Sequence, residues 1–294
     1  MRVTDRMIFD RATRDGGRAS AAAEKAIGVA STGVRVSRAK DDPGAAGLAV
    51  LDRAKAERLD AIATTAARAS DELSAADQAL GTVGTALIRA KELAVQLSSS
   101  TYGAADRAGA VSEVQGLLQD ALGALNTEVG GRYVFGGDQT DAAPFDAAGN
   151  YLGDAGVKQI EIAPGVTAAA SVRADVAVKG AGGGVDVLAV LSGLATALGA
   201  NDVAGVRGAL DTLTTGVAQL ARARTETGNA MNTLDAAVAA SKAGRDEATK
   251  AASNLTDADA VAAASELARA ERALEASLTA TAQGFQFSLL KKLG

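Results

Sequence analysis

Three residue types are missing from this chain of 294 residues: cysteine, histidine and tryptophan. Without cysteine there is no disulfide bond and no thiol chemistry, so packing alone must hold the fold. Without histidine the chain lacks the side chain that most often serves as a general base and as a metal ligand. An enzyme can still use Asp, Glu, Lys, Ser or Tyr, but no convergent cluster of these residues is evident. We therefore predict a protein that is not an enzyme, with no catalytic, cofactor-binding or metal-binding residues.

Charge of one sign and long apolar runs are also scarce. The chain has 30 basic and 35 acidic residues, a net charge of −5, so no strong field attracts it to nucleic acid or to a membrane surface. No run of eighteen apolar residues is present, which predicts no membrane span, and the N-terminal segment lacks the continuous apolar stretch of a cleaved secretory signal. We expect neither nucleic acid nor membrane as a partner.

Aromatic residues are few, with three tyrosines and five phenylalanines, and alanine dominates the apolar set. Alanine is the best helix former, but each alanine buries little area, so such a composition suits thin, closely packed helices. The composition therefore predicts a mainly α-helical fold.

A long helix is predicted to begin in the segment Asp41-Asp42-Pro43-Gly44. Asp42 suits the N-cap position and Pro43 the first helical position. After it, apolar residues recur at spacings of three and four as far as residue 97, and the same pattern returns between residues 203 and 254, which is typical of a coiled-coil seam. We predict that these two helices pack side by side in an elongated antiparallel rod formed by the N- and C-terminal halves. The predicted seam residues are Leu59, Ile62, Leu73, Leu80, Val83, Leu87, Leu213, Leu220 and Leu234.

The composition changes between Arg132 and Gly184, where most of the prolines and half of the aromatic residues lie. Alternating apolar positions on either side of Pro164-Gly165 predict a β-hairpin. Gly130-Gly131 is expected to end the preceding helix. The predicted organisation is terminal helical assembly segments at 1–42 and 255–294, a helical rod at 43–131 and 185–254, and a small β-rich insert at 132–184.

Both ends of the chain have apolar residues without an evident partner. Gly16-Gly17 is expected to weaken the N-terminal helix, since each mid-helix glycine costs about 1 kcal/mol relative to alanine. The C-terminal apolar residues could form one wall of an intramolecular core, or could require neighbouring subunits; we favour the second interpretation. The predicted assembly residues are Met7, Ile8, Phe9, Leu274, Leu278, Phe285, Leu289, Leu290 and Leu293.

The segment Ala30–Pro43 (ASTGVRVSRAKDDP), continued by Ala45–Val50, resembles the N-terminal signature of the flagellin superfamily. Three further segments resemble the junction subunits of that superfamily, which join the flagellar hook to the filament: Met1–Thr4, Gly131–Gly137 and Ser265–Leu278. One stretch, Ala39-Lys40-Asp41-Asp42, is closer to filament flagellin, which therefore stays open as an alternative.

The resemblance implies a structural subunit of the bacterial flagellum that polymerises helically at the hook–filament junction through its terminal segments. It also implies export through the flagellar type III apparatus without a cleaved signal, an extracellular location, and terminal helices that become ordered on assembly. The implied partners are further copies of the chain in a ring, the adjacent hook-associated protein, flagellin, and an export chaperone at the C-terminus. A cytoplasmic coiled-coil scaffold is a second alternative, although such a protein has little use for a hairpin insert.

Overall fold

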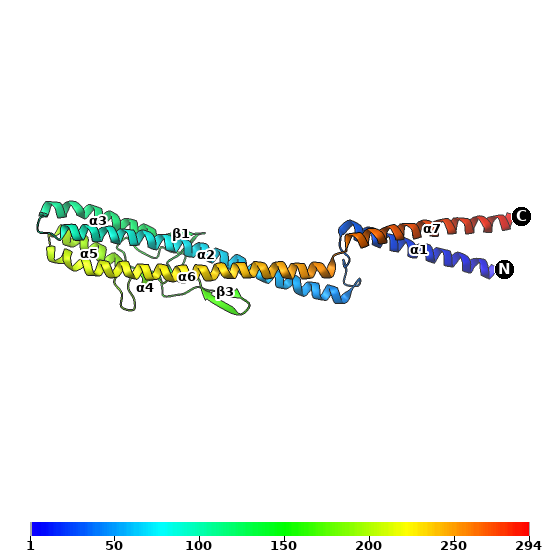
Figure 1. Cartoon of the computed structure of the whole chain (residues 1–294), viewed down its shortest axis with the longest axis horizontal. Helices are drawn as coiled ribbons and strands as arrows, with labels where there is room; N and C mark the ends of the chain where they lie inside the picture. The colour runs from blue at the N-terminus through cyan, green and yellow to red at the C-terminus, as the bar shows by residue number, and fades with distance from the viewer. Residues whose placement is uncertain (1, 294) are drawn as a thin grey trace. The chain divides into compact units, whose positions relative to one another are not determined.

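The computed structural model describes residues 2–293, and within the terminal helices it describes the side chains of Met7 and of residues 9–283. Across these residues the fold is mainly α-helical with two small two-stranded sheets, which confirms the fold class predicted from the sequence (Figure 1). The elements in chain order are α1 (Arg2–Thr32), α2 (Pro43–Leu97), α3 (Ala104–Leu125), β1 (Glu128–Val129), β2 (Arg132–Tyr133), β3 (Gln159–Ala163), β4 (Val166–Ala169), α4 (Ala174–Ala177), α5 (Val187–Gly199), α6 (Val203–Thr256) and α7 (Ala260–Leu293).

The chain forms two compact units. One consists of Met1–Glu57 together with Arg245–Gly294, and is called the terminal unit below; the other consists of Arg58–Gly244 and is called the central unit. Within the described residues, no helix is both long enough and apolar enough to cross a membrane.

In the central unit, helices α2 and α6 lie side by side and antiparallel (Figure 1). Ser70 on α2 donates a hydrogen bond to Asp235 on α6 at 2.9 Å, and Arg224 on α6 donates to both carboxylate oxygens of Asp77 at 2.8 Å. Ser70 precedes Asp77 in the chain, whereas the partner of Ser70, Asp235, follows the partner of Asp77, Arg224. The two helices are therefore antiparallel. Helices α3 and α5 pack against each other beside one end of this pair.

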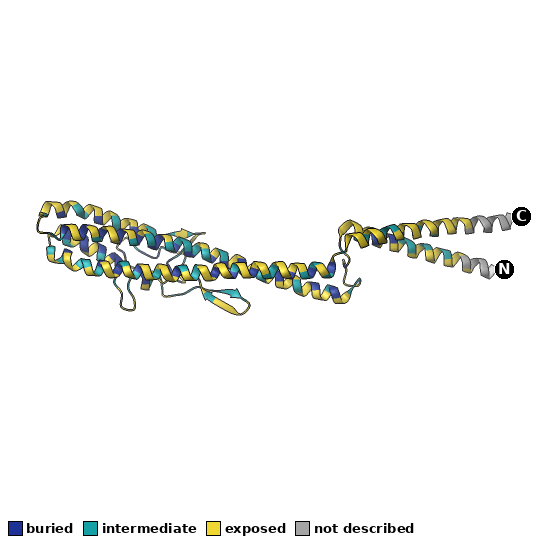
Figure 2. Cartoon of the chain, in the orientation of Figure 1, coloured by how far each residue is buried: buried dark blue, intermediate teal, exposed yellow. Residues whose placement is uncertain are grey.

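The hydrophobic core of the central unit is densest where α2, α3, α5 and α6 come together (Figure 2). Leu125 of α3, Leu191 and Leu198 of α5, and Leu213 of α6 are all completely or almost completely buried there. Burial of a leucine side chain contributes about 1.5–3 kcal/mol, so this four-helix end supplies much of the stability of the unit.

The Gly130-Gly131 pair has a different role from the one expected. Helix α3 ends at Leu125, and the two glycines instead form the turn of the β1–β2 hairpin, with φ angles of 59° and 81°. Two consecutive positive φ angles are what a type I′ hairpin turn needs. The helix stops early because Asn126 exchanges two hydrogen bonds of 3.0 Å with the backbone of Phe145 in the insert.

The rest of the insert forms a small core of its own that joins the helical core. Strands β3 and β4 pair antiparallel around Gly165, whose φ is 78°, as the alternating pattern predicts. The rings of Phe145 and Tyr151 lie 5.2 Å apart, and the Tyr151 hydroxyl donates to a backbone carbonyl, lying 2.9 Å from Phe135 O. Burial raises the pKa of Tyr151 to about 12, so this phenol stays protonated as a donor at neutral pH.

Candidate assembly interface

The segment that resembles the flagellin signature forms a joint within the terminal unit. The backbone N–H groups of Arg35 and Val36 donate to the carbonyl of Thr256, at 2.8 and 3.0 Å, and the N–H of Ala258 donates to the carbonyl of Gly33 at 2.8 Å. Backbone hydrogen bonds therefore join the α1–α2 connection to the α6–α7 connection. Gly33, with a φ of 70°, ends α1 in the left-handed conformation that glycine adopts easily.

Arg35 is the side chain that links this joint to the start of α2. Its guanidinium donates to the carbonyl of Leu255 at 2.7 Å and lies 3.3 Å from a carboxylate oxygen of Asp42. Asp42 in turn accepts a hydrogen bond of 3.0 Å from the N–H of Ala45, in the first turn of α2, which begins at Pro43. The hydrogen bond from Ala45, and then the one from Arg35, lower the pKa of Asp42.

Thr256 completes the joint on the α6 side. It is buried, and its hydroxyl bonds to the carbonyl of Ala252 at 3.0 Å. The neighbouring Asp257 has a lowered pKa, chiefly because the Ser253 hydroxyl donates a hydrogen bond to its carboxylate. No local sequence pattern predicts a role for Arg35 or Thr256, because their partners lie more than two hundred residues away in the chain.

Helices α1 and α7 meet through small residues. Their buried cluster consists of Ala23, Ala26 and Ala270, with Leu267 and Leu274 partly buried against it. Helix α1 runs without a break through Gly16-Gly17, the pair expected to weaken it, because its packing against α7 offsets the modest helix penalty of glycine. Alanine buries little area, so this pair is held weakly compared with the four-helix end of the central unit.

Several large apolar side chains on the terminal helices are exposed and do not belong to this buried cluster. Met7 is 65% exposed, Phe9 49% and Leu278 60%, whereas Leu274 is partly buried against α1. Of the other predicted assembly residues, the side chains of Ile8, Phe285, Leu289, Leu290 and Leu293 lie outside the described residues.

A second group of exposed apolar residues lies on the first turns of α2. Leu48 is 56% exposed and Leu51 66%, and Val50 beside them is also exposed. Leu48 and Leu51 are three residues apart and so share one face of the helix. These residues were not predicted to be exposed, because leucines near the start of a helix have the spacing of core positions. Together the exposed large apolar residues of the terminal unit are Met7, Phe9, Ile27, Leu48, Val50, Leu51, Val261 and Leu278.

All of the predicted seam residues except Leu59 are buried. The buried ones are Ile62, Leu73, Leu80, Val83, Leu87, Leu213, Leu220 and Leu234. Leu59 is partly exposed, and its side chain abuts Gly244 on α6, where an added methyl group would approach it to 3.0 Å.

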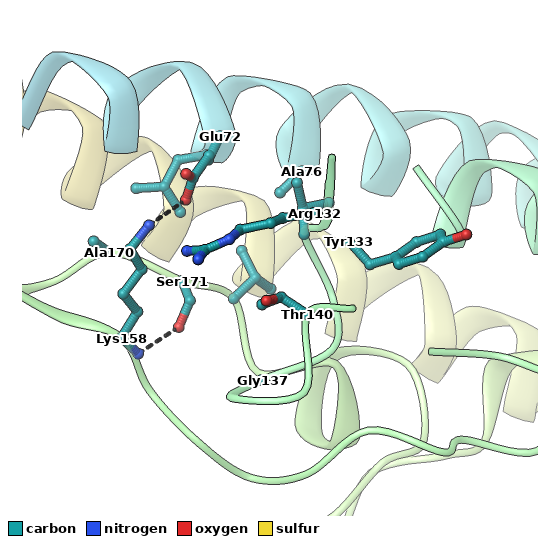
Figure 3. Close-up of a pocket in the computed structure, with 12 residues that line it drawn as sticks. Glu72, Ala76, Arg132, Tyr133, Gly137, Thr140, Lys158, Ala170 and Ser171 are labelled. Atoms are coloured by element: carbon teal, nitrogen blue, oxygen red, sulfur yellow. Dashed lines mark hydrogen bonds and ion pairs between the residues drawn. The ribbon is translucent and has the colours of Figure 1, made fainter. Parts of the chain in front are cut away.

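A small pocket between α2 and the insert is lined by both apolar and polar residues (Figure 3). The ammonium group of Lys158 lies 2.7 Å from Glu72 on α2, and the backbone N–H of Lys158 donates to the Ser171 hydroxyl at 3.0 Å. The Lys158–Glu72 pair thus fastens the insert to α2. No group of three or more potential metal ligands occurs in the part of the chain that the structure describes.

Comparison with known proteins gives a match to the N-terminal part of the chain. Residues 6–140 match the model of the bacterial flagellin N-terminal helical region. Among curated proteins, flagellar hook-associated protein 3 of Escherichia coli is 40% identical over 130 residues, which cover 42% of this chain and 40% of that protein. The match thus spans about two fifths of the curated relative.

Solved structures support the same fold over more of the chain. A candidate flagellar hook-associated protein from Vibrio parahaemolyticus has a TM-score of 0.67 at 21% identity, covering 74% of this chain and 100% of that one. Hook-associated protein 3 from Legionella pneumophila has a TM-score of 0.58 at 13% identity, covering 70% of this chain and 97% of that one. The comparisons confirm the resemblance to the flagellin superfamily and, within it, to hook-associated protein 3.

Proposed function

We propose that this chain is a structural subunit of the bacterial flagellum, not an enzyme, that polymerises at the junction between hook and filament. One observation carries the proposal: the terminal unit exposes eight large apolar side chains while its own helices meet through alanines. Such a surface is typical of a subunit that completes its core against neighbours. The relatives named flagellar hook-associated protein 3 support the choice of the junction over other structural roles.

The physical mechanism is burial on assembly. Each large apolar side chain removed from water contributes about 1.5–3 kcal/mol. Leu48, Leu51 and Leu278 are more than half exposed in the single chain, so their burial between subunits would contribute most of this free energy. The gain opposes the entropy lost when the terminal helices become ordered between subunits. The joint around Arg35 and Thr256 holds the start of α2 against the end of α6, and so presents Leu48 and Leu51 on a fixed backbone.

The partners follow from this proposal. They are further copies of the chain in a ring, the adjacent hook-associated protein on one side and flagellin on the other, with an export chaperone covering the C-terminal apolar residues beforehand. The location is the extracellular flagellum, reached through the flagellar type III apparatus without a cleaved signal.

Filament flagellin is the alternative, supported by Ala39-Lys40-Asp41-Asp42. Immunogold labelling of purified flagella separates the two functions, with flagella from a deletion strain as the control. The junction subunit gives a single band between hook and filament, whereas filament flagellin gives label along the whole filament. Protein found only in the cytoplasm would support the scaffold alternative instead.

The role of the C-terminus has its own test, which is truncation after Ala282. This removes Phe285, Leu289, Leu290 and Leu293. If these residues pack between subunits, the truncated chain folds with an unchanged melting temperature but fails to join the flagellum. If they form an intramolecular core, the melting temperature falls clearly. Lost stability with retained incorporation would overturn the assembly role of this segment.

A further inference from the structure

The β3–β4 hairpin is attached to the helices at two places of different character. At its root, Ile160 and Ala170 are buried in the central core, and the N–H of Ala170 donates to the carbonyl of Lys158 at 2.8 Å. Farther out, Ile162 packs partly against the same core, whereas Val166 beyond it is exposed, and an ion pair links this outer part of the hairpin to a helix. Figure 1 shows the hairpin projecting from the flank of the α2–α6 pair.

The outer link is the pair between Arg58 on α2 and Glu161 on β3, at 2.7 Å. The same carboxylate oxygen of Glu161 also accepts a hydrogen bond of 2.9 Å from the N–H of Gly165 in the hairpin turn. One oxygen atom therefore connects the turn to the helix. Because both side chains of the ion pair are more than a third exposed, dissolved salt screens their attraction.

The root link is better protected. Lys158 pairs with Glu72 at 2.7 Å, and both side chains are less exposed than their counterparts at the outer link. The backbone of Lys158 is held in addition by Ser171 and by Ala170. Apolar burial is not screened by salt, so the root keeps its attachment under conditions that weaken the outer link.

We propose that the β3–β4 hairpin is a salt-released arm. At low ionic strength the Arg58–Glu161 pair holds its outer half on α2. At high ionic strength this half swings away from α2 about the fixed root at Lys158 and Ala170. The strand register shifts between Glu161 and Ala163, and because Ile162 packs partly against the core, the hairpin bends beyond Ile162, toward the turn at Gly165.

The test uses the full chain, which has no cysteine and so accepts a single spin label at a chosen site. A nitroxide at Val166→Cys reports the arm, and one at Gln159→Cys reports the root. Between about 0.01 M and about 1 M salt the Debye length falls from about 30 Å to about 3 Å. We expect the mobile fraction of the Val166 label to rise severalfold over this range while that of the Gln159 label stays constant.

Two variants test whether the salt response of the Val166 label depends on the Arg58–Glu161 pair. Arg58→Gln removes the link to α2 but keeps the Glu161–Gly165 hydrogen bond, so it should make the Val166 label mobile at low salt and abolish its salt response. Arg68→Gln is the matched control, because Arg68 lies exposed on the same helix and has no ion pair within the described residues; it should behave as the wild type. The proposal is overturned if the mobility of the Val166 label does not change with salt, or if the Gln159 label becomes mobile together with it. Both results can be read from the two labelled chains without any change at Arg58 or Arg68.

Discussion

Arg107 on α3 donates a hydrogen bond of 2.7 Å to the side-chain oxygen of Asn201, although 94 residues separate them in the chain. Its guanidinium also donates to the carbonyls of Leu97 at 2.8 Å and Ser99 at 2.9 Å. Arg107 is only 4% exposed. One buried cation thus caps the C-terminal end of α2, where the helix dipole favours positive charge, and ties the α2–α3 connection to the α5–α6 connection.

Substitution of Arg107 by methionine should destabilise the central unit by about 2–4 kcal/mol, because it leaves the carbonyls of Leu97 and Ser99 and the oxygen of Asn201 without this donor. The measurement is the free energy of unfolding from urea denaturation. Arg222→Met is the control: Arg222 is exposed and has no hydrogen bond or ion pair within the described part of the chain, so a change within about 0.5 kcal/mol is expected. Equal effects of the two variants would contradict the clamp role of Arg107.

Leu80 lies on α2 in the predicted seam and is fully buried in the central core. Leu80→Ala should cost about 2–5 kcal/mol, the loss expected for a buried leucine that leaves a cavity. Val95→Ala on the same helix is the control, because Val95 is exposed and its truncation should change the free energy of unfolding by about 0.5 kcal/mol or less. A surface-like value for Leu80→Ala would show that the helix seam has a different register.

The parts of this fold that the sequence predicts are those with a local pattern. The heptad pattern of α2 and α6 and the alternation around Pro164-Gly165 are local signals, and the structure contains both the long helices and the β3–β4 hairpin. Gly130-Gly131 was wrongly predicted to end helix α3, because glycine suits a helix end and a type I′ turn equally well. The contact that ends the helix earlier joins Asn126 to Phe145, which are 19 residues apart in the chain, so no local pattern reveals it.

The candidate interface was harder to predict than the fold. Leu48 and Leu51 obey the same spacing as core leucines, so periodicity cannot distinguish an uncovered face from a buried one. The joint of Arg35 with Leu255 depends on a separation of 220 residues, which no local pattern contains. The family resemblance drew attention to the segment around Arg35 without revealing what the arginine binds.

The pKa of Asp42 offers a test of that joint. Folding stabilises the ionised carboxylate, so its contribution to stability is complete above the ordinary value of 3.8 and is lost as the pH falls through the lower folded-state value. An NMR titration should therefore give Asp42 a pKa below 3.8. Arg35→Gln should raise it toward 3.8 while the hydrogen bond from Ala45 keeps part of the shift. Arg53→Gln, which removes a cation that contacts Thr256 instead, should leave it in place. A wild-type pKa at or above 3.8 would contradict the geometry of the joint.

Hydrogen exchange should separate the weakly held helices from the strongly held ones in an isolated subunit. We expect residues 1–40 and 260–294 to exchange quickly, because α1 and α7 meet mainly through alanines, and residues 59–97 of α2 to exchange slowly. The measurement is mass spectrometry of a verified monomer after brief labelling. Protection of both ends as strong as that of α2 would show that the terminal helices need no partner to become ordered.

The exposed face of Leu48 and Leu51 makes the sharpest test of assembly, because it lies on a part of α2 whose backbone the Arg35 joint holds in place. The double change Leu48→Ser and Leu51→Ser should leave the melting temperature nearly unchanged, since both side chains are more than half exposed in the single chain. Incorporation into flagella should nevertheless fall steeply, because two leucines per subunit lose the burial that assembly supplies, at about 1.5–3 kcal/mol each.

The matched control is the pair Ile88→Ser and Val95→Ser, which removes two exposed apolar residues from the same helix but in the central unit. It should have an equally small effect on the melting temperature and leave incorporation near the wild-type level. If both double variants impair incorporation alike, the interface is not confined to the terminal unit. If the Leu48 and Leu51 variant instead assembles normally, these leucines lie outside the interface, and burial between subunits must come from the helices α1 and α7 alone.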